Sequence, residues 1–215
     1  MKFKKIIGFV SVLFISVVVC AEEELLNKAK KYENEKNLQL AGKYYLEAIK
    51  NNEKNVEAHA GLARCYSQSR MPAEALKEYH KVLELKPANT DALFGIGASY
   101  IEMKDYVKGV EYYKKGLEIE PINKFPGNIY LHHSVGICLV ELGKYKEAKR
   151  YFDEALTIFP DFPDSYLGLG RIAKTEGKKE EALQHYKKAL EIYQKYKAYE
   201  DIELVQKEIE SLTRD

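Results

Sequence analysis

Two adjacent stretches of 34 residues decide the fold: VEAHAGLARCYSQSRMPAEALKEYHKVLELKPAN at 56–89 and TDALFGIGASYIEMKDYVKGVEYYKKGLEIEPIN at 90–123. They align without a gap, and residues of the same kind fall at matching places. The matched pairs are Ala63 with Gly97, Ala75 with Gly109, Tyr79 with Tyr113, Val82 with Gly116, and Pro87 with Pro121. A period of this length indicates a repeated supersecondary unit rather than a repeated single helix.

The same pattern extends to both sides of these stretches. It predicts five units, at 22–55, 56–89, 90–123, 129–162 and 163–196. Each unit has a small residue in its first half, a second small residue twelve positions later, and an aromatic residue four positions after that. From the first unit to the last, these residues are Ala29, Ala63, Gly97, Gly136 and Gly170; Ala41, Ala75, Gly109, Ala148 and Ala182; and Tyr45, Tyr79, Tyr113, Phe152 and Tyr186.

Each unit is predicted to be two antiparallel helices. Within 56–69 and 72–85, apolar and small residues recur at the spacing of one helical face. Pro72 suits the first turn of a helix, and a proline such as Pro87 disfavours helical geometry in the residue before it. The small residues let helices approach closely, and the aromatic side chains fill the spaces between them. Gly143 falls at a turn between two helices, where a left-handed residue is common.

This pattern resembles the tetratricopeptide repeat family, whose 34-residue unit is a helix–turn–helix, and the resemblance covers about four fifths of the chain. It implies an all-α fold, a right-handed α-solenoid of five units. Residues 197–215 are predicted to form a capping helix, because Ile202, Val205, Ile209 and Leu212 make one apolar stripe at helical spacing. Extra residues between the third and fourth units, around Phe125, form either a spacer or a contact loop.

The amino terminus, residues 1–21, is interpreted as a signal peptide. Three lysines precede a short apolar stretch, and Val19, Cys20 and Ala21 come directly before the acidic run 22–24. This pattern predicts export, with cleavage after Ala21 and a periplasmic or cell-envelope location in a bacterium. Two alternatives stay open: Cys20 as a lipidated first residue of a lipoprotein, and a retained signal anchor.

The composition and the motifs give no sign of catalysis. With 34 Lys and Arg against 33 Asp and Glu, the formal net charge is +1, which gives no reason to expect nucleic-acid binding. No phosphate loop, nucleophile elbow or cluster with zinc-ligand spacing is present in the sequence. We therefore expect neither an enzyme, nor a cofactor, nor a metal. Cys65 and Cys138 are expected to be free, packed thiols, and His59 and His132 to be packing residues.

The resemblance also implies a concave groove lined by the first helix of each unit. Read by place within the repeat, the middle of this groove is apolar and aromatic, with an arginine on each side. An apolar patch rimmed by charge is typical of an interaction surface. The predicted groove residues are Arg64, Phe94, Ile101, Tyr130, His133, Ile137, Val140, Leu167 and Arg171.

From these features we expect a non-enzymatic adaptor of the bacterial cell envelope that holds a peptide or a partner's helix in the groove. The alternative is a structural component of an envelope assembly, such as pilus or outer-membrane machinery. In that case a lipid on Cys20 would be the sole link to the membrane. The expected partner is a protein or peptide, and self-association stays open. The lysine and arginine clamp with which some relatives bind a terminal carboxylate is absent from the matching places, which hold residues such as Leu26 and Asp91.

Overall fold

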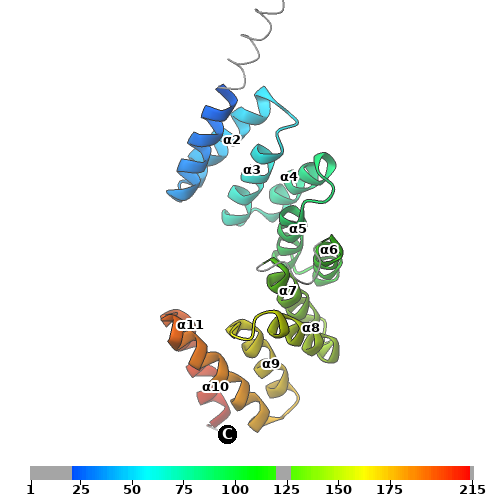
Figure 1. Cartoon of the computed structure of the whole chain (residues 1–215), viewed down its shortest axis with the longest axis vertical. Coiled ribbons are helices and arrows are strands. Elements are labelled where there is room, and N and C mark those ends of the chain that lie inside the picture. Colours follow the sequence, from blue (N-terminus) through cyan, green and yellow to red (C-terminus); the bar gives the residue numbers. More distant parts are fainter. Residues whose placement is uncertain (1–20, 120–126, 214–215) are drawn as a thin grey trace, which may run out of the picture. The chain divides into compact units, whose positions relative to one another are not determined.

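The computed structural model describes residues 21–119 and 127–213. All of the regular structure in these residues is helical, as the repeat pattern predicts (Figure 1). The helices form two compact units that meet in the sequence between Met103 and Lys104. The predicted signal peptide falls outside the described residues except for Ala21, and the predicted contact residue Phe125 also lies outside them.

Unit 1 consists of a helix over residues 21–34 followed by four more helices. They are α2 (Leu38–Asn51), α3 (Val56–Gln68), α4 (Pro72–Leu85) and α5 (Thr90–Glu102). The helix over 21–34 shares a core cluster with α2, each later helix packs against the next, and the two first helices α3 and α5 also touch one another. Asparagine side chains start α3 and α5: Asn55 and Asn89 each accept a hydrogen bond, from the Ala58 and Ala92 amides respectively, at 2.8 Å.

Unit 2 follows the same plan. It consists of α6 (Tyr106–Ile119), α7 (Gly127–Glu141), α8 (Tyr145–Ile158), α9 (Pro163–Thr175), α10 (Lys179–Tyr196) and α11 (Tyr199–Thr213). Successive helices are in contact, and the first helices α7 and α9 touch one another. α8 ends at Ile158, two residues before Pro160, in agreement with the predicted effect of proline.

Aromatic side chains of the second helices pack onto glycines of the first helices. A Cβ added to Gly61 would lie 2.2 Å from the Tyr45 ring, and one added to Gly168 would lie 2.6 Å from the Phe152 ring. Tyr45 and Phe152 are both fully buried. Such rings also pack on small places of the repeat, Phe152 on Gly136 and Tyr186 on Gly170, so glycines on the first helices and aromatic rings on the second helices set how closely the helices approach.

The turns between paired helices use left-handed residues. Gly143 has φ of 70°, as expected from its position, and Gly177 at the matching turn has φ of 74°. At matching turns, however, Lys36, Arg70 and Lys104 adopt φ between 56° and 61°. The sequence pattern did not predict these, because lysine and arginine carry no signal for a left-handed backbone.

Candidate functional site

The first helices place the predicted groove residues in two sets, one in each unit. Arg64 on α3 and Phe94 and Ile101 on α5 belong to unit 1. The set in unit 2 lies on α7 and α9 and comprises Tyr130, His133, Ile137, Val140, Leu167 and Arg171. Because α3 touches α5 and α7 touches α9, each set comes from neighbouring first helices of one unit.

In unit 1, Arg64 is held by a carboxylate of the preceding repeat. Its guanidinium donates two hydrogen bonds to Glu33, at 2.7 and 3.0 Å, and the Tyr45 hydroxyl donates a third at 2.6 Å. Burial would raise the pKa of Glu33, but the hydrogen bonds from Arg64 and Tyr45 outweigh it and hold the pKa of this carboxyl below its ordinary value. Arg64 is therefore oriented by the fold, while its side chain keeps 45% of its surface exposed.

The rest of this face is apolar. Phe94 is 37% exposed, which is unusual for a phenylalanine on a helix that is otherwise packed. Ile101, two turns further along α5, is half-buried. Lys30 forms an ion pair of 2.5 Å with Glu57, which joins the helix over 21–34 to α3. The first helices of unit 1 thus carry an exposed aromatic ring on α5 and charges fixed by ion pairs on α3.

In unit 2, the face centres on a cluster of aromatic rings. Tyr130 is 49% exposed, and its ring meets the edge of Phe162 with the centroids 5.6 Å apart. The His133 ring lies between Phe162, at 5.2 Å, and Phe152, at 5.4 Å. Ser165 Oγ lies 3.4 Å from His133 Nδ1. Burial lowers the pKa of His133, against the opposing effect of Asp164, so the imidazole is held in its neutral form.

The carboxyl-terminal helix α11 holds the basic side of this face. Glu208 on α11 lies 3.6 Å from Arg171 and accepts a hydrogen bond from Lys174 at 2.8 Å. Both cations are on α9, so the cap and the first-helix face are joined by these ion pairs. Leu167 is 7% exposed and packs in the core with Tyr186 and Tyr193, so it offers little surface to a partner. Ile137 and Val140 are half-buried.

Phe162 was not predicted as a site residue. It stands at the amino-terminal cap of α9, where Asn55 and Asn89 stand before α3 and α5, and it forms no capping hydrogen bond. The sequence did contain a signal for Phe162 as a site residue: it is apolar at a place that holds a polar cap residue in other repeats. The buried histidines also have partners that were not predicted: His59 Nδ1 lies 2.6 Å from Glu78, and His132 Nδ1 lies 3.0 Å from Glu154.

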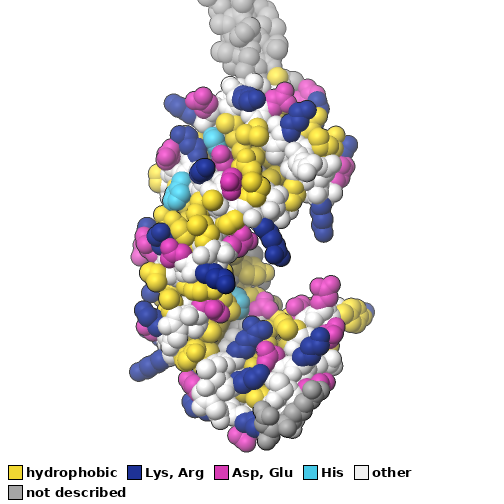
Figure 2. Space-filling model, turned by 180° about the vertical axis from the view of Figure 1, so that it is seen from behind, with side chains coloured by type: hydrophobic (Ala, Val, Ile, Leu, Met, Phe, Trp, Pro, Cys, Tyr) yellow, Lys and Arg dark blue, Asp and Glu magenta, His cyan; other side chains and the backbone are white. Residues whose placement is uncertain are grey.

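Charged and apolar side chains are interspersed on the surface shown in Figure 2, with apolar side chains gathering between those of Lys, Arg, Asp and Glu. Within the described residues, no three His, Cys, Asp or Glu side chains come together as metal ligands would. Cys65 and Cys138 are buried and unbridged, and burial raises the pKa of their thiols to about 11 and about 12. No described helix is long and apolar enough to cross a bilayer.

Comparison with known proteins gives one family. Models of the tetratricopeptide repeat match residues 56–89, 90–123 and 128–195, which together make up more than half of the chain. No curated protein matches the sequence.

Among solved structures, MamA is similar with a TM-score of 0.70 and 19% identity, over 80% of this chain and 97% of MamA. PilW, described as a widely conserved type IV pilus biogenesis factor, has a TM-score of 0.71 and 18% identity, over 89% of this chain and 93% of PilW. YrrB, described as a protein with an unusual peptide-binding site, has a TM-score of 0.65 and 21% identity, over 81% of this chain and 91% of YrrB. At these identities the similarity shows a shared all-helical solenoid fold.

Proposed function

We propose that this chain, which belongs to the tetratricopeptide repeat family, is a non-enzymatic adaptor that binds a peptide or a helix of another protein on its first-helix faces. The observation that carries the proposal is the position of Tyr130. A tyrosine ring that is half exposed and supported from behind by Phe162 is an anchor of the kind that dominates protein interfaces. Phe94 offers an exposed aromatic ring in unit 1, where Glu33 already orients Arg64 on the neighbouring first helix.

The side chains on these faces suit binding of a partner rather than catalysis. The basic side chains beside the apolar surface are paired with Glu33 and Glu208, so their charges are fixed in place before a partner arrives. A pre-oriented charge loses less conformational entropy on binding than a free side chain does. His133 is held neutral between two phenylalanines, which suits a packing role and not proton transfer.

The test begins with the chain from Glu22 as bait in an extract of the source cell envelope, followed by calorimetry with the captured partner. We expect Tyr130→Ala to weaken binding about 30-fold, which corresponds to about 2 kcal/mol, as truncation of an interface anchor does. The matched control is Val107→Ala. Val107 is 65% exposed but lies on the second helix α6, away from the proposed face. Affinities of Tyr130→Ala and Phe94→Ala within a few tenths of a kcal/mol of the wild type would contradict the proposal.

We further propose that the protein is exported to the cell envelope. The support is the basic and apolar segment 1–21 and the contacts that begin directly after it. Glu22 Oε1 accepts a hydrogen bond from Asn52 at 3.0 Å and another from Asn55, so the first residue after the predicted cleavage site already belongs to the fold.

The second candidate is a lipid-anchored structural component of an envelope assembly, which the place of Cys20 directly before the folded residues favours. Mass spectrometry of the mature amino terminus separates the two. A chain that starts at Glu22 supports the exported adaptor, and an acylated Cys20 supports the anchored component. A Cys20→Ala form that still fractionates with membranes would rule out lipid anchoring as the cause.

A further inference from the structure

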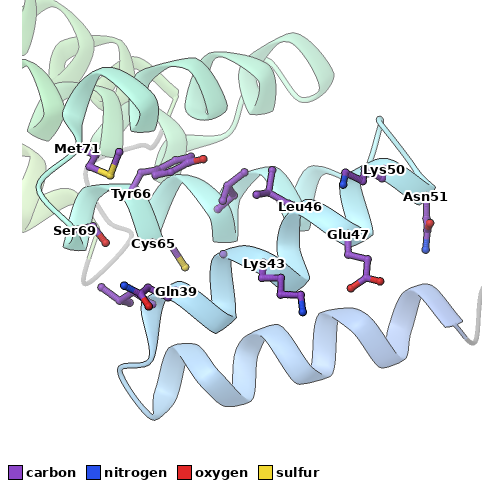
Figure 3. A pocket seen from close by; sticks show the side chains of 13 residues that line it. Gln39, Lys43, Leu46, Glu47, Lys50, Asn51, Cys65, Tyr66, Ser69 and Met71 are labelled. Carbon is purple, nitrogen blue, oxygen red and sulfur yellow. The ribbon is translucent and has the colours of Figure 1, made fainter.

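A second surface of unit 1 departs from the repeat pattern in a way that the first-helix faces do not explain. A groove of about 690 Å³ lies between α2 and α3 and ends at the start of α4 (Figure 3). Its floor is Leu62 and Cys65, which are 1% and 3% exposed. It shares no residue with the predicted first-helix groove. Its lining is Leu38, Gln39, Gly42, Lys43, Leu46, Glu47, Lys50, Asn51, Leu62, Cys65, Tyr66, Ser69 and Met71.

Gly42 opens this groove. The matching place in the other four repeats holds a larger side chain: Leu76, Val110, Lys149 and Leu183. A Cβ built on Gly42 would meet Leu62 Cδ1 at 3.7 Å, which is ordinary contact, so the packing of the fold does not demand a glycine here. A glycine inside a helix also costs roughly 0.5–1 kcal/mol relative to alanine. Its presence in α2 therefore calls for a reason other than stability.

Leu46 is the second departure. It is 42% exposed beside the groove, and the matching places of the other repeats hold His80, Lys114, Asp153 and Lys187. The fold thus makes this a solvent-facing place, and a polar residue occupies it in every repeat except the first. Leu46 lies one turn beyond Gly42 on the same face of α2, so the exposed side chain borders the space that the glycine leaves.

Met71 is the third departure. It stands at the amino-terminal cap of α4, is 41% exposed and makes no capping hydrogen bond. The four matching caps all hold polar residues: Asn37 and Asp105 accept hydrogen bonds from the Leu40 and Lys108 amides, both at 3.2 Å, whereas Lys144 and Lys178 make no capping hydrogen bond. Met71 is therefore exceptional in being apolar and exposed. An apolar residue at this position forgoes about 1 kcal/mol of helix stability. Figure 3 shows Met71 close to Tyr66 at one end of the groove.

From these three convergent departures we infer that the groove between α2 and α3 is a second docking site, and that it takes an amphipathic helix with leucine-type side chains on one face and acidic residues beside them. Three departures from the repeat pattern fall in one groove, a helical glycine and two exposed apolar side chains at otherwise polar places, and sites of function are where such conflicts gather. The apolar floor and the exposed Leu46 and Met71 would cover the apolar face of the bound helix.

The charge of the bound helix follows from the rim. Lys43 and Lys50 lie along α2 and form no ion pair with any described residue, whereas Lys81, Lys115 and Lys188 on other second helices are each paired with a glutamate three or four residues away. Two unpaired lysines against one Glu47 leave the rim net positive. Acidic residues on the partner complement this charge.

The helical conformation of the bound partner follows from the two helices that line the groove. Both walls are helices, whose backbone hydrogen-bonding groups are already used within each helix, so an extended peptide would find no free strand edge to pair with. The lining follows α2 from Leu38 to Asn51, the full 14 residues of that helix and about 20 Å in length. A bound helix of three to four turns matches this length.

The test uses a fluorescein-labelled synthetic helical peptide of about fourteen residues, with leucines at i, i+3, i+4 and i+7 and glutamates on the other face. Two further peptides replace the glutamates by lysine or the leucines by serine. Binding to the full chain is followed by fluorescence anisotropy up to 1 mM peptide. We expect the leucine–glutamate peptide to bind in the micromolar range and each of the other two peptides to bind at least tenfold more weakly.

Two variants decide the location without threatening the fold. Gly42→Leu installs the residue of Leu76 and Leu183 and fills the groove, and Met71→Asp installs the cap that Asp105 provides. We expect both to keep or raise the thermal midpoint and to weaken peptide binding at least tenfold. Val107→Lys, an exposed apolar residue of α6, is the matched control and should bind as the wild type does. Failure to bind up to 1 mM, equal binding to Gly42→Leu and wild type, or equal binding of the lysine peptide would overturn the inference.

Discussion

At the scale of single residues, the turns between paired helices hold unequal strain. Arg70 adopts φ of 56° and Gly143 adopts φ of 70°, although both occupy the same kind of turn. A left-handed backbone costs a side-chain-bearing residue roughly 1–2 kcal/mol, whereas glycine adopts it freely. Replacing such a residue by glycine relieves this cost. The greater conformational freedom of glycine in the unfolded chain offsets about 0.4–1 kcal/mol of that gain.

We therefore predict that Arg70→Gly stabilises the protein by about 0.5–1 kcal/mol, because relief of the strained backbone exceeds the added entropy of the unfolded chain. Gly143→Ala is the reverse change and should destabilise it by a similar amount. No atom lies within 4 Å of a Cβ added at Gly143, so the effect there is conformational and not steric. Urea denaturation measures both. Equal midpoints for Arg70→Gly and wild type would show that this turn carries no strain.

At the scale of helices, the carboxyl-terminal helix α11 completes the core of unit 2. Val205 is fully buried in a cluster with Tyr186 and Tyr193, while its neighbour Leu204 is 42% exposed. We predict that Val205→Ala lowers the free energy of unfolding by about 2 kcal/mol through the cavity it leaves, and that Leu204→Ala changes it by less than about 0.5 kcal/mol. Chemical denaturation of the two variants gives the comparison. Similar small effects for both would mean that α11 unfolds separately and does not cap the core.

At the scale of the whole molecule, the repeat period predicted the helix pairs because it records contacts that recur at one spacing. Tyr45 against Gly61, Tyr79 against Gly95 and Phe152 against Gly168 are the same contact between successive repeats, so its recurrence makes it visible in the sequence. Contacts that occur once were not predictable in this way. Glu33 forms an ion pair with Arg64, which lies 31 residues further along the sequence, and nothing in the periodic pattern predicts this pairing. The predicted surface residues were therefore found on the first helices, but the pairing of their charges was not foreseen.

The same limit applies to the groove between α2 and α3. Gly42, Leu46 and Met71 are visible in an alignment of the repeats only as separate exceptions. Each exception alone resembles ordinary variation, and the structure is needed to show that all three line one groove. The repeat period thus predicts the regular packing of the helices. Residues that depart from the period can be interpreted only when the structure shows which of them are neighbours.

Across the molecule, the two units should differ in their response to acid. Burial lowers the pKa of His132, His133 and His185, all in unit 2, against the opposing charges of Glu154, Asp164 and Glu181. Near pH 6.5 these histidines take up protons in the unfolded chain but not in the folded one. The contribution of the three neutral histidines to stability is therefore present above that pH and is lost as the pH falls below it. In unit 1, both nitrogens of His59 have polar partners, the Glu78 carboxylate at 2.6 Å and the Glu53 carbonyl at 3.0 Å. We predict that lowering the pH from 7.5 to 5.5 speeds hydrogen exchange, corrected for its intrinsic rate, more in α7 to α10 than in α3 to α5. His133→Gln should reduce this difference, and equal acceleration in both units would show that the buried histidines of unit 2 do not control its stability.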